Sequence, residues 1–445
     1  MAKDAPYSRS EIVARIRDAG VVGAGGAGFP THVKAEARAD VVIANGCECE
    51  PLVRSDRHVL AEAADEVLGG LAAMMIATGA PTGYVAVRES EADLADSLGR
   101  AAARVRGVRI VGVKDNYPAG DEHLLVYEVT GRVIPQGGIP PAVGVVVSNV
   151  NTLANVSRAL RGTPVTSRVV SVCGDLERPG IAEVPVGTTV ADVLRLTGNA
   201  GGLEGKSVLL SGVMMGELCE DTARPVDKRI GAVVVLPNEN QVIVRKSMPL
   251  ETIVKRAASV CCQCTFCTEL CPRHLVGHGI TPHKIMRSVG WTRVFTPDIA
   301  GAAFCSGCGL CGVYVCPMLL SPDRICFAVK AEMARRGLKV DQRPAPAEAV
   351  RPHRLVPHGR IVEKTGIAAY DRKLEFSGAL EPDRVAIPLA QHAGAPARAI
   401  VRVGEAVTRG RRIGEVPRGE VGADVHASID GVVTGINHCV VIEKR

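Results

Sequence analysis

Aromatic residues are scarce in this chain: only thirteen of its 445 residues are Phe, Tyr or Trp. Its hydrophobic cores must therefore consist mainly of Val, Leu, Ala and Ile, within an apolar content of 47%. One core cannot organise a chain of this length, because single cores rarely grow beyond about 250–300 residues. The sequence thus predicts several domains.

A strong charge of one sign and long apolar runs are also missing. The net charge of +6 is small for this length and indicates no nucleic-acid partner. No stretch approaches the ~20 apolar residues of a membrane span, so we expect none. The first twenty residues lack the apolar segment of a secretory signal peptide. We expect a cytoplasmic protein, in which thiols stay reduced and disulfides are not expected to form.

Cysteine, in contrast, is abundant, and nine of the fifteen cysteines lie in two short runs. The first run has the spacing C-x2-C-x2-C-x3-C-P, which is that of bacterial two-cluster ferredoxins. The second run differs by one extra residue before its last cysteine. In such ferredoxins the fourth cysteine of a run binds the other cluster. The pattern predicts two [4Fe–4S] clusters, one held by Cys261, Cys264, Cys267 and Cys316 and the other by Cys271, Cys305, Cys308 and Cys311.

The alternative for these cysteines is a pair of four-cysteine zinc sites. Such sites usually show two CxxC pairs rather than three cysteines at steps of three. Cysteines that fit neither pattern are expected to be small buried apolar side chains, namely Cys173, Cys219, Cys262, Cys326 and Cys439. The three histidines after the first run are expected to have a surface role rather than to bind a metal: His274, His278 and His283.

A glycine loop near the N-terminus is a candidate anion site. A helix is expected over residues 11–19, with Ser8 or Ser10 as its cap. The loop that follows contains Gly23, Gly25, Gly26 and Gly28, and Lys34 adds a positive charge. Successive N–H groups in such a loop suit a phosphate, although glycine-rich strings also occur in plain turns.

Three further segments place polar residues after buried strands, where ligands bind in α/β sheets. "VVIANG" (41–46) is followed by Glu48 and Glu50, and "VRIVGV" (108–113) by "YPAGDE" (117–122). "VGVVVSNVNTLANV" (143–156) runs from a strand into a polar helix start. Each polar group could be a cap or a turn, but together they indicate one α/β domain with a shared site.

These segments resemble a known superfamily. "GAGGAGFPTHVK", "NGCECEP", "YPAGDE" and "SNVNTLANV" are similar, in this order, to the FMN- and NADH-binding segments of the flavoprotein subunit of respiratory complex I. With the cysteine runs, the chain resembles the RnfC protein of the Rnf electron-transport complex. It is most similar, over essentially its full length, to the cobalamin reductases of propanediol-utilising bacterial microcompartments.

The resemblance implies an FMN site and an NADH site. Phe29 would stack on NADH and Glu50 would bind its hydroxyl groups. The residues implied for FMN are Gly23, Gly25, Gly26, Gly28 and Lys34 at its phosphate and ring edge, Asn45 and Glu48 along the site, Tyr117, Gly120, Asp121 and Glu122 near the ring, and Asn149 and Thr152 at the third loop.

The chain departs from the complex I flavoprotein in two places. Cys47 stands where that flavoprotein has Asp, and "AEA" follows Lys34 where it has aromatic residues that sandwich the nicotinamide. FMN binding is therefore better supported than the NADH pose.

The resemblance also implies where the boundaries between domains lie. It implies a multidomain α/β protein with a Rossmann-like FMN/NADH domain (1–162), a soluble-ligand-binding β-grasp domain (163–247) and a ferredoxin-like α domain with both clusters (248–340). Within the second domain, the shared "SGVMMG" turn (211–216) has an unknown ligand or a structural role. A linker or wrapping arm (341–383) and a C-terminal barrel-sandwich β domain (384–445) follow. The barrel-sandwich hairpin carries no lysine, which argues against a role as a covalent lipoyl or biotinyl carrier.

By resemblance, the function is to pass electrons from NADH through FMN and two [4Fe–4S] clusters to a corrinoid. Its partners would be an adenosyltransferase and the proteins of a microcompartment shell or lumen, in whose interior it would lie. One alternative is an NADH-oxidising protein that serves a non-corrinoid acceptor, in NAD recycling, a glycyl-radical microcompartment or an Rnf-like chain. The other alternative is an assembly protein of a larger complex, without turnover of its own.

Overall fold

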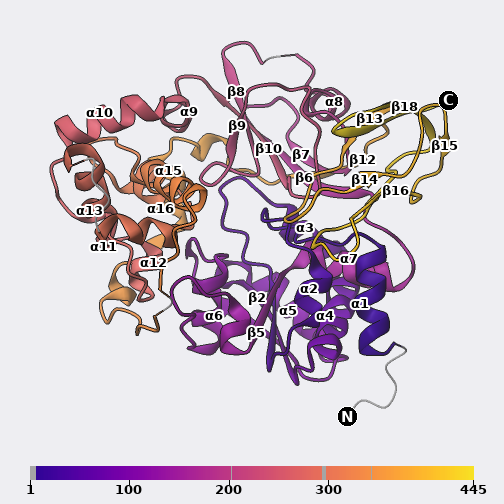
Figure 1. The fold of residues 1–445 in the computed structure, drawn as a ribbon, viewed down its shortest axis with the longest axis horizontal. Coiled ribbons are helices and arrows are strands. Elements are labelled where there is room, and N and C mark those ends of the chain that lie inside the picture. Colours follow the sequence, from indigo (N-terminus) through magenta and orange to yellow (C-terminus); the bar gives the residue numbers. More distant parts are fainter. Residues whose placement is uncertain (1–6, 202, 293–296, 342) are drawn as a thin grey trace.

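A four-stranded parallel sheet, in the order β3-β2-β1-β5, forms the centre of the N-terminal domain (Figure 1). The computed structural model describes residues 7–201, 203–292, 297–341 and 343–445. The strands β1 and β5 are continuous buried apolar runs because both faces of the sheet are covered there, whereas the edge strand β3 is partly exposed. The elements of this domain are α1 (Arg9–Asp18), α2 (Thr31–Glu36), β1 (Val41–Asn45), α3 (Ser55–Glu62), α4 (Ala64–Thr78), β2 (Thr82–Arg88), α5 (Ala92–Ala102), β3 (Val108–Val113), β4 (Asn116–Tyr117), α6 (Glu122–Thr130), β5 (Val145–Asn149) and α7 (Val150–Leu160).

The first helix agrees with the sequence-based expectation. Its N-cap is Ser8, whose side chain accepts from the Glu11 N–H while the Glu11 carboxylate accepts from the Ser8 N–H. This reciprocal capping box satisfies two of the N–H groups that a helix start leaves unpaired. Ile12 and Ile16 point into the core on one face of the sheet.

The second domain contains a mixed sheet in the order β12-β7-β6-β10-β8-β9. Its first strand in that order, β12 (Glu375–Ala379), comes from the segment expected to be a linker or arm and pairs in parallel with β7. The other elements are β6 (Ser167–Gly174), β7 (Gly180–Pro185), α8 (Val190–Leu196), β8 (Lys206–Leu210), β9 (Glu217–Cys219), β10 (Ala232–Pro237) and α9 (Gln241–Ser247).

Short helices surround both cysteine runs in the third domain, here called the cysteine domain. It lies on the left in Figure 1, next to both preceding domains. Its helices are α10 (Leu250–Val260), α11 (Phe266–Glu269), α12 (Pro272–Leu275), α13 (Pro282–Arg287), α14 (Pro297–Ala300) and α15 (Pro322–Arg335). Among the described residues, no helix has the length and apolar character of a membrane span.

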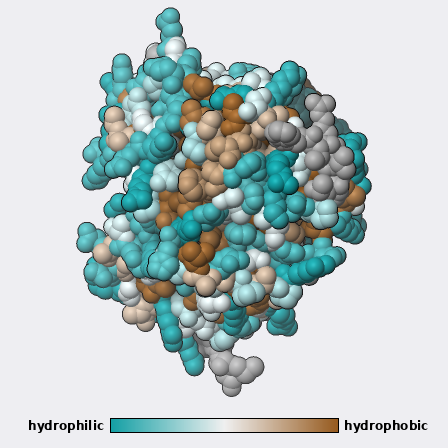
Figure 2. Space-filling view, turned by 90° about the vertical axis from the view of Figure 1, so that its left-hand side faces the viewer, coloured by the Kyte–Doolittle hydropathy of each residue, from teal (hydrophilic) through white to brown (hydrophobic). Residues whose placement is uncertain are grey.

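The outer face of the cysteine domain is partly apolar. Figure 2 shows apolar side chains gathered in a band on this side of the molecule. Among the described residues of the domain, the exposed large apolar side chains are Leu250, Val260, Phe266, Met318, Leu319, Phe327 and Leu338.

The segment after the cysteine domain is a wrapping arm rather than a free linker. Its strand β11 (Val356–Pro357) pairs with β4, so that Val356 lies opposite Tyr117. Helix α16 (His358–Lys364) follows, and β12 then joins the mixed sheet. The arm thus ties the N-terminal domain to the second domain.

Two small antiparallel sheets form the C-terminal domain, in the orders β13-β19-β18-β15 and β14-β16-β17. They enclose a core of their own that includes Val385, Ile413 and Val440. The strands are β13 (Arg384–Pro388), β14 (Arg398–Ala399), β15 (Ala406–Val407), β16 (Arg412–Glu415), β17 (Val425–His426), β18 (Gly431–Ile436) and β19 (Cys439–Glu443).

One apolar core runs through the first three domains. It joins Ile43 and Val147 of the parallel sheet to Val234 of the mixed sheet and to Leu310 in the second cysteine run. Because interiors are close-packed, a shared core holds the domains in a fixed arrangement. Residues far apart in sequence are thereby kept at fixed distances.

Candidate functional site

The carboxyl ends of β1 and β5 meet beside the glycine loop. Asn45 and Asn149 are paired neighbours at these strand ends. The Asn45 Nδ2 donates to the Gly120 carbonyl at 2.9 Å. A Cβ at Gly25 would lie 3.6 Å from the Asn149 Cβ. The structure therefore brings residues from all three predicted polar loops together with the glycine loop.

Hydrogen bonds hold the first residues of the glycine loop in place, whereas the middle of the loop, at Gly26, is open. The Gly23 N–H donates to the Phe29 carbonyl at 2.8 Å, and the Ala24 N–H donates to the Thr152 Oγ1 at 2.8 Å. Gly26 has a φ of 106°, and nothing in the described chain lies within 4 Å of the place a Cβ there would take. Such an open cradle of backbone fits the phosphate and ring edge of a flavin nucleotide.

Lys34 is paired within the protein. Its Nζ donates to the Glu122 Oε1 at 3.0 Å and to the Val147 carbonyl at 2.9 Å. The two residues implied for the flavin site thus meet each other, and much of the lysine charge is balanced by Glu122.

The position of Gly120 requires a glycine, because the backbone of Cys47 lies very close to it. A Cβ at this position would lie 2.5 Å from the Cys47 carbonyl oxygen, so only glycine fits. Cys47 itself is buried, and burial raises the pKa of its thiol to about 12. It therefore stays a neutral thiol where the complex I flavoprotein has a carboxylate.

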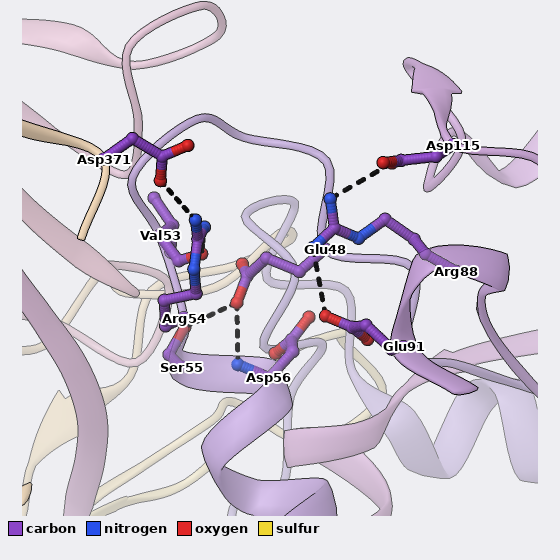
Figure 3. A network of polar contacts seen from close by, with 9 residues as sticks. All are labelled: Glu48, Val53, Arg54, Ser55, Asp56, Arg88, Glu91, Asp115 and Asp371. Atoms are coloured by element: carbon purple, nitrogen blue, oxygen red, sulfur yellow. Dashed lines mark hydrogen bonds and ion pairs between the residues drawn. The ribbon is translucent and has the colours of Figure 1, made fainter. Parts of the chain in front are cut away.

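Glu48 and Asp56 form a half-buried acidic pair over the strand ends (Figure 3). The Glu48 Oε2 accepts from the Asp56 N–H at 2.8 Å. The Asp56 carboxylate accepts from the Nδ2 groups of Asn149 and Asn151, both at 2.6 Å. Burial, and after it the charge of Asp56, raises the pKa of Glu48 to about 8. Glu48 therefore keeps its proton at neutral pH. Nothing in the sequence marked Asp56 as a site residue; it lies in the first turn of α3.

A pH dependence of stability follows from Glu48. The native state holds the Glu48 proton up to about pH 8, whereas the unfolded chain releases it near pH 4.5. The contribution of this group to the free energy of unfolding is therefore fully present below pH 4.5. It decreases as the pH rises, by up to about 1.4 kcal/mol per pH unit. In urea titrations of the flavin-free protein between pH 6 and 8, Glu48→Gln should flatten this decline. An equal decline in both proteins would contradict the protonated state.

Glu50 lies beneath the 211–216 turn of the second domain. Its two carboxylate oxygens accept from the N–H groups of Met214 and Met215, both at 2.8 Å. The residue is only 7% exposed, and burial raises its pKa. The structure thus directs Glu50 towards another domain, while Phe29 remains half-buried beside the glycine loop.

Tyr117 and Asp121 connect the N-terminal domain to the cysteine domain. The Tyr117 hydroxyl donates to the Cys308 carbonyl at 2.5 Å. Asp121 caps α6 through its Oδ1, and its Oδ2 accepts from the Arg273 Nη2 at 2.8 Å. Burial alone would raise the pKa of Asp121, but the charges of Arg273 and His123, together with the hydrogen bonds that both residues donate to it, lower the pKa. Arg273 follows Cys271 by two residues, and sequence reasoning gave it no role.

The first group of cysteines lines one cavity. Cys261, Cys264, Cys267 and Cys316 border it together with His283 and Met286. After burial, the nearby Cys316 contributes most to raising the pKa of Cys267 to about 12. The structure therefore brings the last cysteine of the second run to the first three of the first run, as the exchange pattern predicts.

The second group of cysteines is more deeply placed. Burial, and after it the thiols of Cys271 and Cys305, raise the pKa of Cys308 well above its ordinary value. Burial, and after it Asp323 and the thiols of Cys308 and Cys305, likewise raise the pKa of Cys311. Thiols that would otherwise stay protonated become good cluster ligands when iron replaces the proton. This donor set fits a cluster.

The two cysteine loops share one backbone shape. Gln263 and Thr265 have φ of 56° and 67°, and Gly307 and Gly309, at the matching positions, have 71° and 73°. Non-glycine residues in this region cost of order 1 kcal/mol and occur mainly at functional sites. Loops of this shape turn N–H groups inward as an anion nest, which suits the negative charge of a thiolate-bound cluster.

Within the described residues, no three His, Cys, Asp or Glu side chains are spaced to hold a single metal ion. The fit of a cluster therefore rests on the thiol donor sets, the cavity and the loop shape.

Two expectations about neighbouring residues were wrong. Cys262 is exposed and Cys219 is partly exposed, whereas Cys173, Cys326 and Cys439 are buried as expected. His278 is not at the surface: it is 3% exposed and its Nε2 lies 3.1 Å from the Ile134 carbonyl.

Three family models match parts of the chain. Residues 16–158 match the Nuo51 FMN-binding domain, residues 260–321 a 4Fe-4S dicluster domain, and residues 365–445 the RnfC barrel sandwich hybrid domain. The chain is thus a multidomain α/β protein with FMN-binding, 4Fe–4S and barrel-sandwich hybrid domains.

Similar proteins agree with these matches. The chain is 39% identical to the cobalamin reductase PduS of Salmonella typhimurium, over 98% of this chain and 97% of that protein. It is 32% identical to the C component of the Na(+)-translocating ferredoxin:NAD(+) oxidoreductase complex of Acetobacterium woodii, over 58% of this chain and 57% of that component. An NAD+-reducing [NiFe]-hydrogenase shares the fold, with a TM-score of 0.52 and 23% identity over 75% of this chain and 64% of the hydrogenase chain.

Proposed function

The chain belongs to the family of the cobalamin reductase PduS, and from this premise we propose that it uses NADH to reduce a corrinoid, with FMN and two [4Fe–4S] clusters as cofactors. A flavin and iron–sulfur oxidoreductase is the class that the domain matches support. The NADH donor, the number of clusters and the corrinoid acceptor are the parts that the experiments below test.

One contact supports this proposal more than any other. The hydrogen bond of 2.5 Å from Tyr117 to the Cys308 carbonyl joins a residue expected at the flavin ring to one expected to bind a cluster. Tyr117 is 2% exposed, so water is excluded from the junction. A dry, fixed junction between two cofactor sites is what a protein that passes electrons internally requires.

Bound FMN would supply the conversion between a two-electron hydride donor and one-electron carriers. The chain's own residues do the rest. The glycine loop and Thr152 shape the cradle, and Asn45 ties the loop of Gly120 to the strand end. The pair of Asp121 and Arg273 docks the cysteine domain against this site.

We further propose the domain types, the domain boundaries and the site residues that the resemblance implies. The N-terminal domain (1–162) would be Rossmann-like, the second (163–247) a β-grasp domain, and the cysteine domain (248–340) ferredoxin-like. The arm would span 341–383 and the barrel sandwich 384–445. The site residues are those named from the sequence, with Phe29 and Glu50 assigned to NADH.

The proposed setting is the cytoplasm, inside a bacterial microcompartment. There the corrinoid would be reduced so that an adenosyltransferase can remake coenzyme B12, and shell or lumen proteins would be neighbours. The similarity to the RnfC-type proteins favours one alternative, an NADH-oxidising protein that feeds a non-corrinoid acceptor.

An anaerobic titration of the reconstituted protein with NADH tests the donor. We expect flavin and cluster absorbance to bleach stepwise, and we expect repeated turnover when an artificial one-electron acceptor is added. Bleaching by dithionite but not by NADH would contradict the NADH route. Absence of any turnover would favour an assembly protein.

A further inference from the structure

A buried arginine of the second domain, Arg168, reaches the glycine loop. It belongs to β6 and is 4% exposed. Its Nη2 donates to the Ala24 carbonyl at 3.0 Å, and its Nε donates to the Ile230 carbonyl at 3.4 Å. Its Nη1 is buried and has no hydrogen-bond partner in the described part of the chain. A buried donor without a partner is costly and needs an explanation, such as a ligand.

A second arginine, Arg229, lies at the other end of the same loop. A Cβ on Gly28 would lie 2.8 Å from the Arg229 Cδ, so the arginine stem passes against the loop backbone. Its side chain is 38% exposed, and its Nη2 pairs with the Asp227 Oδ2 at 2.6 Å. Two arginine side chains from the second domain thus flank the loop, the guanidinium of Arg168 at Ala24 and the aliphatic stem of Arg229 at Gly28.

The charges around the loop leave a role for these arginines. Lys34 is paired with Glu122 and Arg229 with Asp227, so neither is free to neutralise an anion alone, whereas the Arg168 Nη1 has no partner among the described residues. Arg168 faces Asp56 and Asp227 and, to a smaller extent, Glu48, whose raised pKa keeps it protonated at neutral pH. Guanidinium groups are well suited to phosphate, because their planar N–H groups match its oxygens.

We propose that Arg168 and Arg229 bind a phosphate group of the ligand held by the glycine loop, so that the second domain completes this site. The inference rests on the proposed flavin and dinucleotide function. The phosphate has two candidate sources, the monophosphate of FMN and the pyrophosphate of NADH.

Binding measurements with paired ligands test the assignment without reference to activity. The full chain with its clusters assembled and its flavin removed is titrated with FMN and with riboflavin, which lacks the phosphate. Arg168→Met and Arg229→Gln are expected to lower the preference for FMN over riboflavin by about 10- to 100-fold, the value of a charge-assisted hydrogen bond. The affinity for riboflavin should stay near that of the wild type.

Titrations with a second pair of ligands show whether the arginines bind the monophosphate of FMN or the pyrophosphate of NADH. The FMN-loaded protein is titrated with ADP-ribose and with adenosine. A reduced preference for ADP-ribose, with FMN preference retained, assigns the arginines to the dinucleotide pyrophosphate. Arg195→Gln, an exposed arginine of the same domain paired with Asp192, is the matched control and should change neither preference.

The outcomes are distinct. If both variants keep both preferences, or lose affinity for all four ligands in equal proportion, the assignment is overturned. If the wild-type chain binds neither flavin, the proposed function and the assignment fail together. Retained discrimination in both variants, with normal flavin binding by the wild type, overturns the assignment alone.

Discussion

Replacing Cys316 by serine is expected to remove the same cluster that is lost when Cys261 is replaced. The two residues lie in different runs but border one cavity. A cluster that loses one of its four thiolates is held weakly, and the remaining cluster has its own four ligands. The variant should therefore contain half of the wild-type iron, and the spectrum of the dithionite-reduced protein should show one cluster instead of two.

The pairing itself is tested by comparing variants. Cys261→Ser, Cys316→Ser and the double variant should leave the same iron content and the same residual electron paramagnetic resonance spectrum. Cys271→Ser and Cys308→Ser should leave the other spectrum. Cys439→Ser, at a buried cysteine of the C-terminal domain, should keep all iron. If Cys316→Ser instead gave the residual spectrum of Cys308→Ser, each run would hold its own cluster.

Replacing Arg273 by methionine should destabilise the contact between the N-terminal domain and the cysteine domain. The side chains of Arg273 and Asp121 are 14% and 9% exposed. Removing one partner leaves the Asp121 carboxylate buried without its cation, which typically costs about 3 kcal/mol or more. The loss is expected in the free energy of unfolding, measured by urea titration of the cluster-loaded protein.

The surface pair of Arg343 and Asp341 provides the control. Its side chains are 74% and 80% exposed, so Arg343→Met should change stability by less than about 1 kcal/mol. Adding Asp121→Asn to Arg273→Met should recover part of the loss, because asparagine still caps α6 and carries no charge. Equal effects of Arg273→Met and Arg343→Met would contradict a docking role.

Local patterns in the sequence predicted the parts of the site that depend on local geometry. The spacing of the cysteines determines a loop around a cluster corner, and the structure gives both loops the same backbone shape at Gln263 and Gly307. The glycine loop and the strand ends at Asn45 and Asn149 are likewise local, and the parallel sheet brings them together.

Contacts between domains could not be predicted in this way. Glu50 accepts from residues 164 and 165 positions away, and nothing near it in the sequence indicates those partners. Arg168 reads as an ordinary strand residue, yet it lies against Ala24 in another domain. The strands β11 and β12 of the arm are short, and each forms only because a partner strand offers an unpaired edge.

The most direct test of the account is to mix the NADH-reduced protein with hydroxocobalamin in the absence of oxygen, following flavin, cluster and corrinoid absorbance together. The account predicts that the corrinoid spectrum shifts to a reduced form while flavin and cluster absorbance returns. An unchanged corrinoid spectrum, with ferricyanide still able to reoxidise the protein, would contradict it and point to a different acceptor.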